Sequence, residues 1–408
     1  MLKRNLYYEC LNHLQNDEVT IITGARQVGK TTILKQIENY LTEKGLPCFY
    51  INLEDPDFLQ LLNDHPRNIF NLFSLPKNQK IYFLVDEIQY LNNSSNFLKY
   101  LYDEFSKRIK LIVSGSSAFY MDTKFKDSLA GRKKIFILYT LSIDEFLLFN
   151  NKPDLARLIT EIPYQSLTIE NIPVTEQREI SYYIERYLIY GGYPRVVLAS
   201  TDKEKEELLN ELLYSYIKKD IMESGIKNQQ KALELLKILS DQISSLLNTN
   251  TLSKLLRVST TAIDNYIHTL KKSFHIAAVS PYFTNIRKEI KKMPKMYFLD
   301  LGLRNALIRN FNLINYRQDI GKLYENFIFR QFLDRLPLEQ IHFWRTQQQN
   351  EVDFVLNEKY VYEVKYNLAN FVLSKYKKFI SLYPGKMFNV VYRIGEAEKL
   401  ENVFYRKF

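Results

Sequence analysis

The first 150 residues alternate short apolar runs with segments of helical periodicity. The apolar runs predict five buried strands, at residues 19–23, 48–56, 81–85, 109–115 and 133–141. Between the first two runs, apolar residues recur at helical spacing from Ile33 to Leu41. Strands separated by helices predict an α/β fold with a doubly wound parallel sheet, and the ligand site of such a sheet lies at the carboxyl ends of its strands.

A glycine-containing segment joins the first predicted strand to this helix. It fits the pattern G-x-x-x-x-G-K-[ST] and comprises Gly24, Ala25, Arg26, Gln27, Val28, Gly29, Lys30 and Thr31, followed by Thr32. Backbone N–H groups of such a loop, together with the positive end of the helix dipole, bind phosphate oxygens. We expect Lys30 to contact the β- and γ-phosphates of ATP and Thr31 to bind Mg²⁺. The alternative is a chance glycine turn before a helix. This interpretation is weaker, because a predicted strand precedes the motif and a predicted helix follows it.

The third apolar run ends in two adjacent acids, Asp86 and Glu87. Desolvated charges are costly without a partner, so a buried strand does not normally end in this way. Mg²⁺–ATP on the phosphate loop would be that partner. Asp86 would hold the ion, and Glu87 would orient and deprotonate the attacking water. The alternative is a solvated strand end.

Polar residues also follow the fourth predicted strand and precede the fifth. Ser114 or Ser116 could touch the γ-phosphate or the attacking water, or both could belong to a serine-rich turn. Arg132 could act on a γ-phosphate in its own chain or in a neighbouring subunit of a homo-oligomer, or it could be a surface arginine. The sequence leaves these alternatives open.

Composition limits the environment and the partners. The chain of 408 residues carries 56 basic and 46 acidic residues, a net charge of +10 that favours an anionic partner such as nucleic acid. The two cysteines, Cys10 and Cys48, indicate a reducing compartment without a disulfide framework. We therefore expect a cytoplasmic protein. No signal peptide and no membrane span are expected, because no apolar run reaches roughly 18 uncharged residues.

Six segments of the chain occur in an order that resembles a known family: "TGARQVGKTT", "FLVDEIQYL", "SGSSA", "LAGR", "LSIDEF" and "YGGYPRVV". The chain resembles the AAA-type ATPases of family AAA_14, which are usually fused to the C-terminal domain DUF4143. The resemblance covers nearly the whole chain and implies an ASCE-type P-loop ATPase with a helical lid, a winged helix and a nuclease-like tail. It suggests an ATPase domain at 1–195, a helical and winged-helix region at 196–300 and a nuclease-like domain at 301–408. In the last segment Arg195 would sense nucleotide, or the segment would be only a structural turn.

A helix-turn-helix pattern lies in the middle of the chain, after a stretch of helical periodicity from about 204 to 247. One helix would bury Leu252, Leu255 and Leu256, and Ser259 or Thr260 would cap the second, which would bury Ile263, Ile267 and Leu270. A strand and a basic hairpin follow, as in a winged helix.

A winged helix predicts particular DNA contacts. The second helix would enter the major groove with its outward residues Thr261, Asp264, Asn265 and His268. The basic hairpin would contact phosphates through Arg287, Lys288, Lys291 and Lys292. The alternative is a lid or an interdomain packing module, and Asp264 in the second helix is unhelpful for DNA contact.

The C-terminal region has the residue order of a PD-(D/E)XK nuclease. A helix at 321–333 carries Glu325, and two strand-like runs joined near residues 357 and 358 carry Asp353 and then Glu363 and Lys365. Asp353, Glu363 and Glu325 would hold Mg²⁺ or Mn²⁺, and Lys365 with the ion would activate water. The alternatives are a surface hairpin with cross-strand charge pairs, or a fold that no longer cuts or cuts only with a partner.

Two functions remain open from the sequence. The first is an ATP-hydrolysing protein that couples its nucleotide state to DNA binding or processing. The second is a nucleotide-switched regulatory or scaffold protein, which binds a protein partner through a nuclease-like domain that does not cleave.

Overall fold

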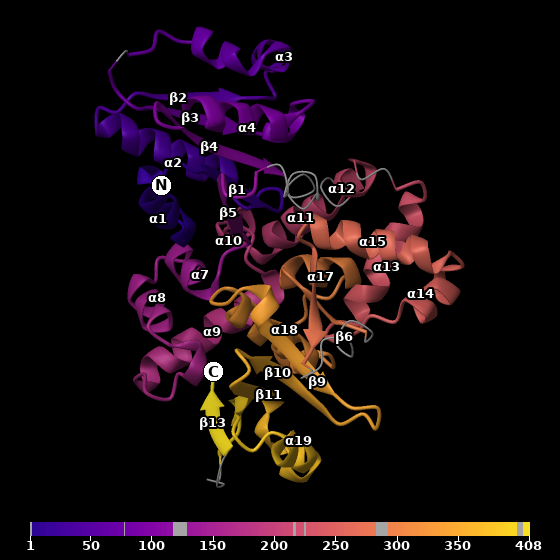
Figure 1. The fold of residues 1–408 in the computed structure, drawn as a ribbon. Coiled ribbons are helices and arrows are strands. Elements are labelled where there is room, and N and C mark those ends of the chain that lie inside the picture. Colours follow the sequence, from indigo (N-terminus) through magenta and orange to yellow (C-terminus); the bar gives the residue numbers. More distant parts are fainter. Residues whose placement is uncertain are drawn as a thin grey trace. The chain divides into compact units, whose positions relative to one another are not determined.

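The computed structural model describes residues 2–76, 78–116, 129–214, 218–223, 226–282, 293–397 and 403–408. The chain divides into two compact units (Figure 1). The first comprises Met1–Thr140 with Lys272–Phe274, and the second comprises Leu141–Lys271 with His275–Phe408. Each unit has its own sheet.

The first unit contains a five-stranded sheet in which every strand pair is parallel. Its order is β2-β3-β4-β1-β5, and the strands are β1 (Val19–Gly24), β2 (Cys48–Asn52), β3 (Ile81–Asp86), β4 (Ile109–Ser116) and β5 (Lys133–Leu138). The predicted parallel sheet is therefore confirmed. The second strand ends earlier than predicted, because Asp55 caps a helix that starts with Pro56.

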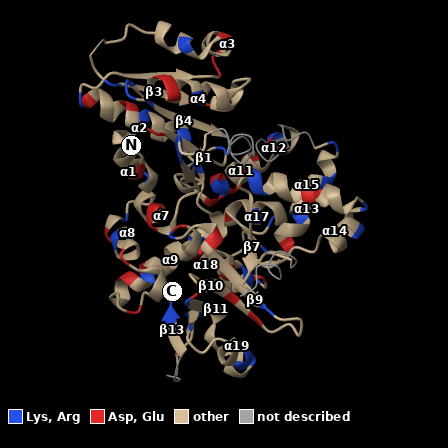
Figure 2. Cartoon of the chain, viewed as in Figure 1, with Lys and Arg blue, Asp and Glu red and all other residues tan. Residues whose placement is uncertain are grey.

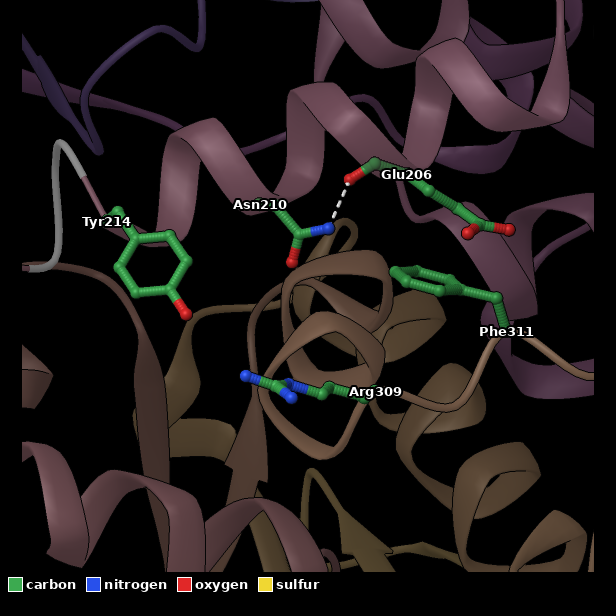
Figure 3. Close-up of a pocket in the computed structure, with 5 residues that line it drawn as sticks. All are labelled: Glu206, Asn210, Tyr214, Arg309 and Phe311. Carbon is green, nitrogen blue, oxygen red and sulfur yellow. Dashed lines mark hydrogen bonds between the residues drawn. The ribbon is translucent and has the colours of Figure 1, made fainter.

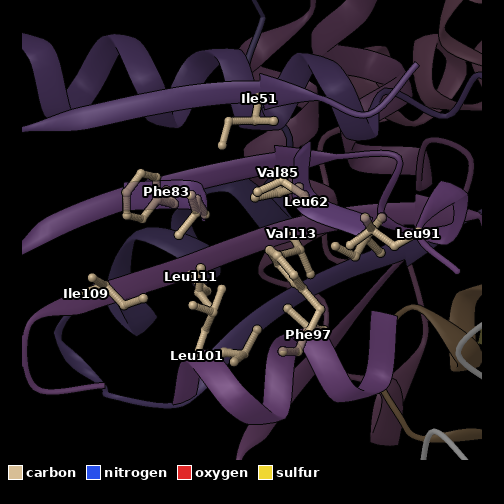
Figure 4. Packing of buried hydrophobic residues seen from close by; sticks show 14 of the residues in the cluster. Ile51, Leu62, Phe83, Val85, Leu91, Phe97, Leu101, Ile109, Leu111 and Val113 are labelled. Atoms are coloured by element: carbon tan, nitrogen blue, oxygen red, sulfur yellow. The ribbon is translucent and has the colours of Figure 1, made fainter. Parts of the chain in front are cut away.

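Helices and 3₁₀ segments connect these strands. They are α1 (Asn5–Asn12), α2 (Lys30–Glu43), α3 (Pro56–Asp64) and α4 (Ser94–Phe105), with 3₁₀ segments at His13–Gln15, Pro66–Asn71 and Ile88–Tyr90. Alternate residues of β3 and β4, such as Phe83 and Leu111, pack with Phe97 and Leu101 of α4 in one apolar cluster (Figure 4). Burying each side chain of this size contributes about 1.5–3 kcal/mol, so the cluster fixes the strands that lead to the loops at their carboxyl ends.

The second unit contains an eight-stranded mixed sheet with the order β13-β12-β11-β10-β9-β7-β8-β6. Its strands are β6 (Ser245–Leu246), β7 (Ile276–Pro281), β8 (Lys295–Phe298), β9 (Ile341–Arg345), β10 (Glu351–Leu356), β11 (Tyr360–Asn367), β12 (Met387–Ile394) and β13 (Val403–Lys407). The predicted C-terminal hairpin is confirmed, because β10 and β11 are antiparallel. Asn357 and Glu358 form its turn with φ values of 46° and 56°.

Helices make up much of the rest of the second unit. They are α7 (Ile143–Phe149), α8 (Pro153–Thr160), α9 (Val174–Tyr190), α10 (Pro194–Val197), α11 (Asp202–Leu212), α12 (Lys218–Glu223), α13 (Gln229–Asp241), α14 (Thr249–Leu256), α15 (Thr260–Lys272), α17 (Leu301–Ile308), α18 (Ile320–Leu333) and α19 (Lys377–Leu382). Short 3₁₀ segments lie at Tyr164–Ser166, Ile314–Tyr316, Leu338–Gln340, Leu368–Asn370 and Leu373–Tyr376. The stretch predicted as helical from 204 to 247 ends instead in β6, after Ser244 adopts a left-handed conformation with φ 55°.

The helix-turn-helix pattern forms α14 and α15. Ser259 is the cap of α15, because its hydroxyl accepts a hydrogen bond from Ala262 N at 3.1 Å. The expected burial of Leu255 is wrong, since this side chain is 60% exposed while Leu252 and Leu256 are buried. Leu252 and Leu256 lie four residues apart on one stripe, whereas Leu255 is rotated by about 100° from Leu256 around the helix.

Candidate nucleotide site and the acidic cluster of the C-terminal sheet

The phosphate loop connects β1, which ends at Gly24, to α2, which begins at Lys30. Gly29 immediately before the helix has φ 104°, a conformation that residues with a Cβ rarely adopt. Nζ of Lys30 donates hydrogen bonds to the carbonyl oxygens of Gly24 at 3.1 Å and Ala25 at 2.7 Å. Thr31 and Thr32 follow it with exposed side chains. The loop therefore wraps around the Lys30 side chain, with both hydroxyl residues open to solvent.

Asp86 ends β3 and is 2% exposed. Its Oδ2 accepts a hydrogen bond from the Tyr50 hydroxyl at 2.8 Å, and its Oδ1 accepts one from the Ser114 hydroxyl. Ser114 reaches Asp86 because β4 lies between β1 and β3 in the sheet. Of the two candidate serines, Ser114 is thus directed at the acid. Ser116 pairs through its backbone with Gly24, and its side chain lies outside the described residues.

Glu87 follows in a left-handed conformation with φ 58°. A non-glycine residue held in this region costs about 1–3 kcal/mol, and such residues occur at functional sites as well as in turns. The backbone N–H of Glu87 donates to Oδ1 of Asp86 at 3.2 Å, and the Glu87 carboxylate accepts a hydrogen bond from the side-chain amide of Gln89. The half-buried Glu87 carboxylate is therefore positioned by its neighbours at the carboxyl edge of the sheet.

Arg4 supports the phosphate loop, although it was not among the predicted site residues. It is 6% exposed, and its Nη1 donates to the carbonyl oxygen of Val28 in the loop at 2.9 Å. Its Nη2 donates to the carbonyl oxygens of Tyr139 at 2.9 Å and Thr140 at 3.4 Å. Arg4 thereby joins the loop to the segment after β5. A lone arginine before an amphipathic helix gives no local pattern from which this role could be predicted.

Arg132 lies at the other end of the sheet. Its carbonyl oxygen accepts a hydrogen bond from Val19 N at the start of β1, and its Nε donates to Asp103 at 2.6 Å. The phosphate loop follows the opposite end of β1, which is six residues and roughly 20 Å long. The expected contact with a phosphate in the same chain is therefore not seen, because the strand separates the two. A contact with a neighbouring subunit stays a prediction.

A second acidic group lies in the sheet of the second unit and surrounds Lys295 of β8. Nζ of Lys295 lies 2.7 Å from Oε1 of Glu325 and 2.8 Å from Oε1 of Glu351. It also lies 3.2 Å from Oδ1 of Asp353. Burial alone lowers the pKa of Lys295, but these carboxylates raise it well above its usual value. Lys295 therefore stays charged, although it is only 3% exposed.

Glu363 and Lys365 of β11 complete this group. They lie two residues apart on the strand, so their side chains share a face, as predicted. Lys365 and the hydroxyl of Tyr376 both donate to Oε1 of Glu363, the latter at 2.7 Å. Oδ2 of Asp353 accepts from Val364 N at 2.9 Å. Burial and the neighbouring Asp353 raise the pKa of Glu363 to about 8. Burial also raises the pKa of Asp353, but Lys295 and Lys365 outweigh it and leave that pKa below its usual value.

The two acidic groups differ in their fit to a metal ion. At the phosphate loop, Asp86 and the exposed Thr31 provide oxygen ligands of the kind that Mg²⁺ prefers, and no cation is recorded on Asp86 among the described residues. In the second unit, the Lys295 ammonium contacts oxygens of Glu325 and Asp353, two of the three expected metal ligands, and Lys365 donates to the third, Glu363. Across the described part of the chain, no cluster of three or more His, Cys, Asp or Glu residues is arranged to hold a metal. The C-terminal residues therefore do not fit the Mg²⁺ or Mn²⁺ expected there.

Comparison with protein families identifies two of the domains. A model described as an AAA domain, AAA_14, matches residues 16–147, and a model for a domain of unknown function, DUF4143, matches residues 320–406. The chain carries an AAA_14 domain and a DUF4143 domain. Between them, residues 181–313 match DUF8612, another domain of unknown function. With its parallel sheet and its strand-loop-helix, the AAA_14 domain has the fold of an AAA-type P-loop ATPase.

The chain is similar in sequence to uncharacterized proteins and, at low identity, to solved structures. An uncharacterized protein of Haemophilus influenzae is 27% identical over 88% of this chain and 91% of its own length. An uncharacterized protein of Methanocaldococcus jannaschii is 25% identical over 86% of this chain and 75% of its own. Among solved structures, C. elegans PCH-2 has a TM-score of 0.33 at 14% identity, over 53% of this chain and 63% of that one. AMPPCP-bound DnaA from Aquifex aeolicus has 0.28 at 14% identity, over 65% and 86%.

Within DUF8612, the segment "YGGYPRVV" packs against the start of α17. The carboxylate of Asp300 accepts hydrogen bonds from Gly192 N and from Leu303 N, at 2.8 and 2.9 Å. A Cβ on Gly302 would lie 2.0 Å from the carbonyl oxygen of Tyr190, so only glycine fits there. Sequence reasoning missed this contact, which supports the structural-turn interpretation. Arg195 itself pairs with Glu211, and its role as a nucleotide sensor stays a prediction.

The same domain contains α15, whose side chains divide as the helical periodicity predicted. Ile263, Ile267 and Leu270 are buried. The outward residues Thr261, Asp264, Asn265 and His268 are exposed. The expected phosphate-contacting residues Arg287, Lys288, Lys291 and Lys292 lie outside the described residues. In Figure 2, Lys and Arg are spread over many helices and strands, so the net positive charge does not by itself indicate one surface.

A pocket of about 350 Å³ lies in the second unit between α11 and the segment that follows α17 (Figure 3). It is lined by Glu206, Asn210, Tyr214, Arg309 and Phe311. Its single arginine and single glutamate give it no net formal charge, so its lining selects neither an anion nor a cation. No helix in the described ranges is long and apolar enough to cross a membrane.

Proposed function

We propose that the AAA_14 domain binds Mg²⁺–ATP at the phosphate loop and hydrolyses it. The observation that carries this proposal is the convergence of Lys30, Asp86 and Glu87 at the carboxyl edge of one parallel sheet. Backbone N–H groups before α2 would bind the phosphates, with Lys30 released from the loop carbonyls to contact the β- and γ-phosphates.

The two acids have separate roles in this proposal. Mg²⁺, when bound, neutralises charge on the β- and γ-phosphate oxygens. Thr31 and Asp86 would hold it, with Asp86 oriented by the hydrogen bonds from Tyr50 and Ser114. Glu87 would orient the attacking water and accept its proton.

Replacement of Lys30 by alanine tests nucleotide binding. We expect Lys30→Ala to lose tight binding of a fluorescent ATP analogue and to lose phosphate release. Lys44→Ala is the matched control, because Lys44 caps the other end of the same helix and is exposed. Wild-type binding and turnover in Lys30→Ala would overturn the proposal.

We also propose what ATP hydrolysis is used for: the nucleotide state of the AAA_14 domain controls DNA binding through α15. The exposed face of α15 supports this, together with the net charge of the chain. We expect Asn265→Glu to weaken DNA binding, measured by fluorescence anisotropy at several salt concentrations. Lys203→Gln, at an exposed position on α11, makes the same change in net charge and is the control. Equal losses in both variants would indicate only a general charge effect.

A second candidate is a nucleotide-switched scaffold, in which the DUF4143 domain docks a partner and does not cleave. The contacts of Lys295 with three carboxylates favour it. A cleavage assay with Mg²⁺ or Mn²⁺ on several DNA forms discriminates the two candidates. Cleavage that Asp353→Ala abolishes would exclude the scaffold interpretation.

A further inference from the structure

The DUF4143 domain brings carboxylates together in its interior, and one lysine lies at their centre. Glu325 comes from α18, Glu351 and Asp353 from β10, and Lys295 from β8. These elements are separated in the sequence by up to 58 residues, so the lysine is not part of the D…E-x-K pattern. The arrangement therefore depends on the tertiary fold.

The lysine uses oxygen atoms of two of the three acids that were expected to hold an ion. Its Nζ contacts Oε1 of Glu325 and Oδ1 of Asp353, at 2.7 and 3.2 Å. The other oxygen of Asp353 is bonded to Val364 N. A divalent ion at its usual distance of about 2.1 Å from these same oxygens would lie next to the ammonium and be repelled by it.

The formal charges are also almost balanced without a metal. The acids are Glu325, Glu351, Asp353 and Glu363, and the cations paired with them are Lys295, Arg345 and Lys365. Four carboxylates therefore face three cations. A buried charge is tolerated when it is paired in this way, so the cluster does not need a further cation to fold.

We infer that Lys295, from the segment that matches DUF8612, is the resident cation of this cluster, and that the carboxylates of the DUF4143 domain surround its ammonium in place of a divalent metal ion. The inference deepens the second candidate function, on which it rests, by stating what occupies the centre of the docking domain. ATP binding at the phosphate loop does not depend on it.

Mn²⁺ binding to the full-length, nucleotide-free chain tests the inference. We expect wild type and Asp353→Asn to bind the same amount of Mn²⁺, measured as the loss of the free Mn²⁺ signal by electron paramagnetic resonance. Lys295→Met should gain Mn²⁺ binding that the added Asp353→Asn substitution removes, and Mn²⁺ should raise its Tm. Lys359→Met, at an exposed turn of the same sheet, should behave as wild type.

Two results would overturn the inference. One is Mn²⁺ binding to wild type that Asp353→Asn abolishes. The other is a folded Lys295→Met variant that gains no Mn²⁺. If Lys295→Met does not fold, the comparison of wild type with Asp353→Asn still shows whether Asp353 binds Mn²⁺ in the wild-type chain. Because this test measures Mn²⁺ binding and not DNA cleavage, a failure here is distinct from a failure of the second candidate function, which the cleavage assay reports.

Discussion

The chain contains two carboxylate pairs, Asp86 with Glu87 and Asp353 with Glu363, that have different neighbours. Beside Asp86 and Glu87, the nearby lysine, Lys30, donates to backbone carbonyls of its own loop. Beside Asp353, Lys295 donates to the carboxylate itself. The hydrogen bonds recorded on Asp86 come from hydroxyl groups and a backbone N–H.

In our proposals, this difference separates a site for Mg²⁺ from a cluster whose cation is Lys295. Hydroxyl donors orient a carboxylate and leave its negative charge in place, so an incoming Mg²⁺ is attracted. A buried ammonium neutralises part of that charge and must be displaced before an ion can bind. On these proposals, the position of the nearest lysine distinguishes the two acidic pairs.

The largest effect should come from removing Glu87, with removal of Glu363 as the contrast. Glu87→Gln should bind ATP but lower turnover by about 10²- to 10⁴-fold, the usual contribution of a general base. Glu363→Gln should leave turnover at the wild-type rate. Phosphate release and binding of an ATP analogue measure both. Normal turnover in Glu87→Gln would mean that the base is another residue.

The residues of the phosphate loop could be predicted because the pattern is contiguous and its flanking strand and helix are local. The hairpin that joins Asp353 to Glu363 was predictable for the same reason, since the strands are adjacent in the sequence. Lys295 and Arg4 could not be found, because the atoms that they contact lie up to 58 and 136 residues away. A single sequence does not record such contacts.

Arg4 is also a buried cation, but it donates to carbonyl oxygens of the chain and so positions a loop, whereas Lys295 contacts carboxylates. Arg4→Met should lower ATP turnover by about 10- to 100-fold, since a displacement of about 1 Å in a binding loop has effects of this size. Lys3→Met, the exposed neighbour, is the control. Arg4→Lys should restore part of the activity. A loss of Tm without any loss of ATP affinity or turnover would show that Arg4 is only structural.

Ser114→Ala tests the orientation of Asp86 by a hydroxyl donor. Without this hydrogen bond, the apparent affinity for Mg²⁺ in ATP turnover should fall about tenfold, as for other groups that orient a metal ligand. Saturating Mg²⁺ should restore most of the rate. A Mg²⁺ titration of phosphate release measures this, and an unchanged titration curve would show that Ser114 does not orient the acid.

The smallest effect is a pH dependence at a second buried lysine, Lys110, which lacks the carboxylates that surround Lys295. Its Nζ donates to the carbonyl oxygens of Asn16 and Glu18, at 2.9 and 2.5 Å. Burial, with the charge of Lys80 as the next cause, lowers its pKa from 10.5 to about 7. Between these two values the unfolded chain binds more protons than the folded chain, so the free energy of unfolding rises with pH.

Lys110→Met should therefore flatten this dependence. From pH 7 upward, the Tm of wild type should rise relative to that of Lys110→Met, and below pH 7 the difference should be constant, because the lysine is then protonated in both states. Lys99→Met, at an exposed position on α4, should follow wild type at every pH. If Lys110→Met and wild type keep parallel Tm profiles, Lys110 stays charged in the folded protein and the two carbonyl oxygens stabilise an ammonium as well as the carboxylates around Lys295 do.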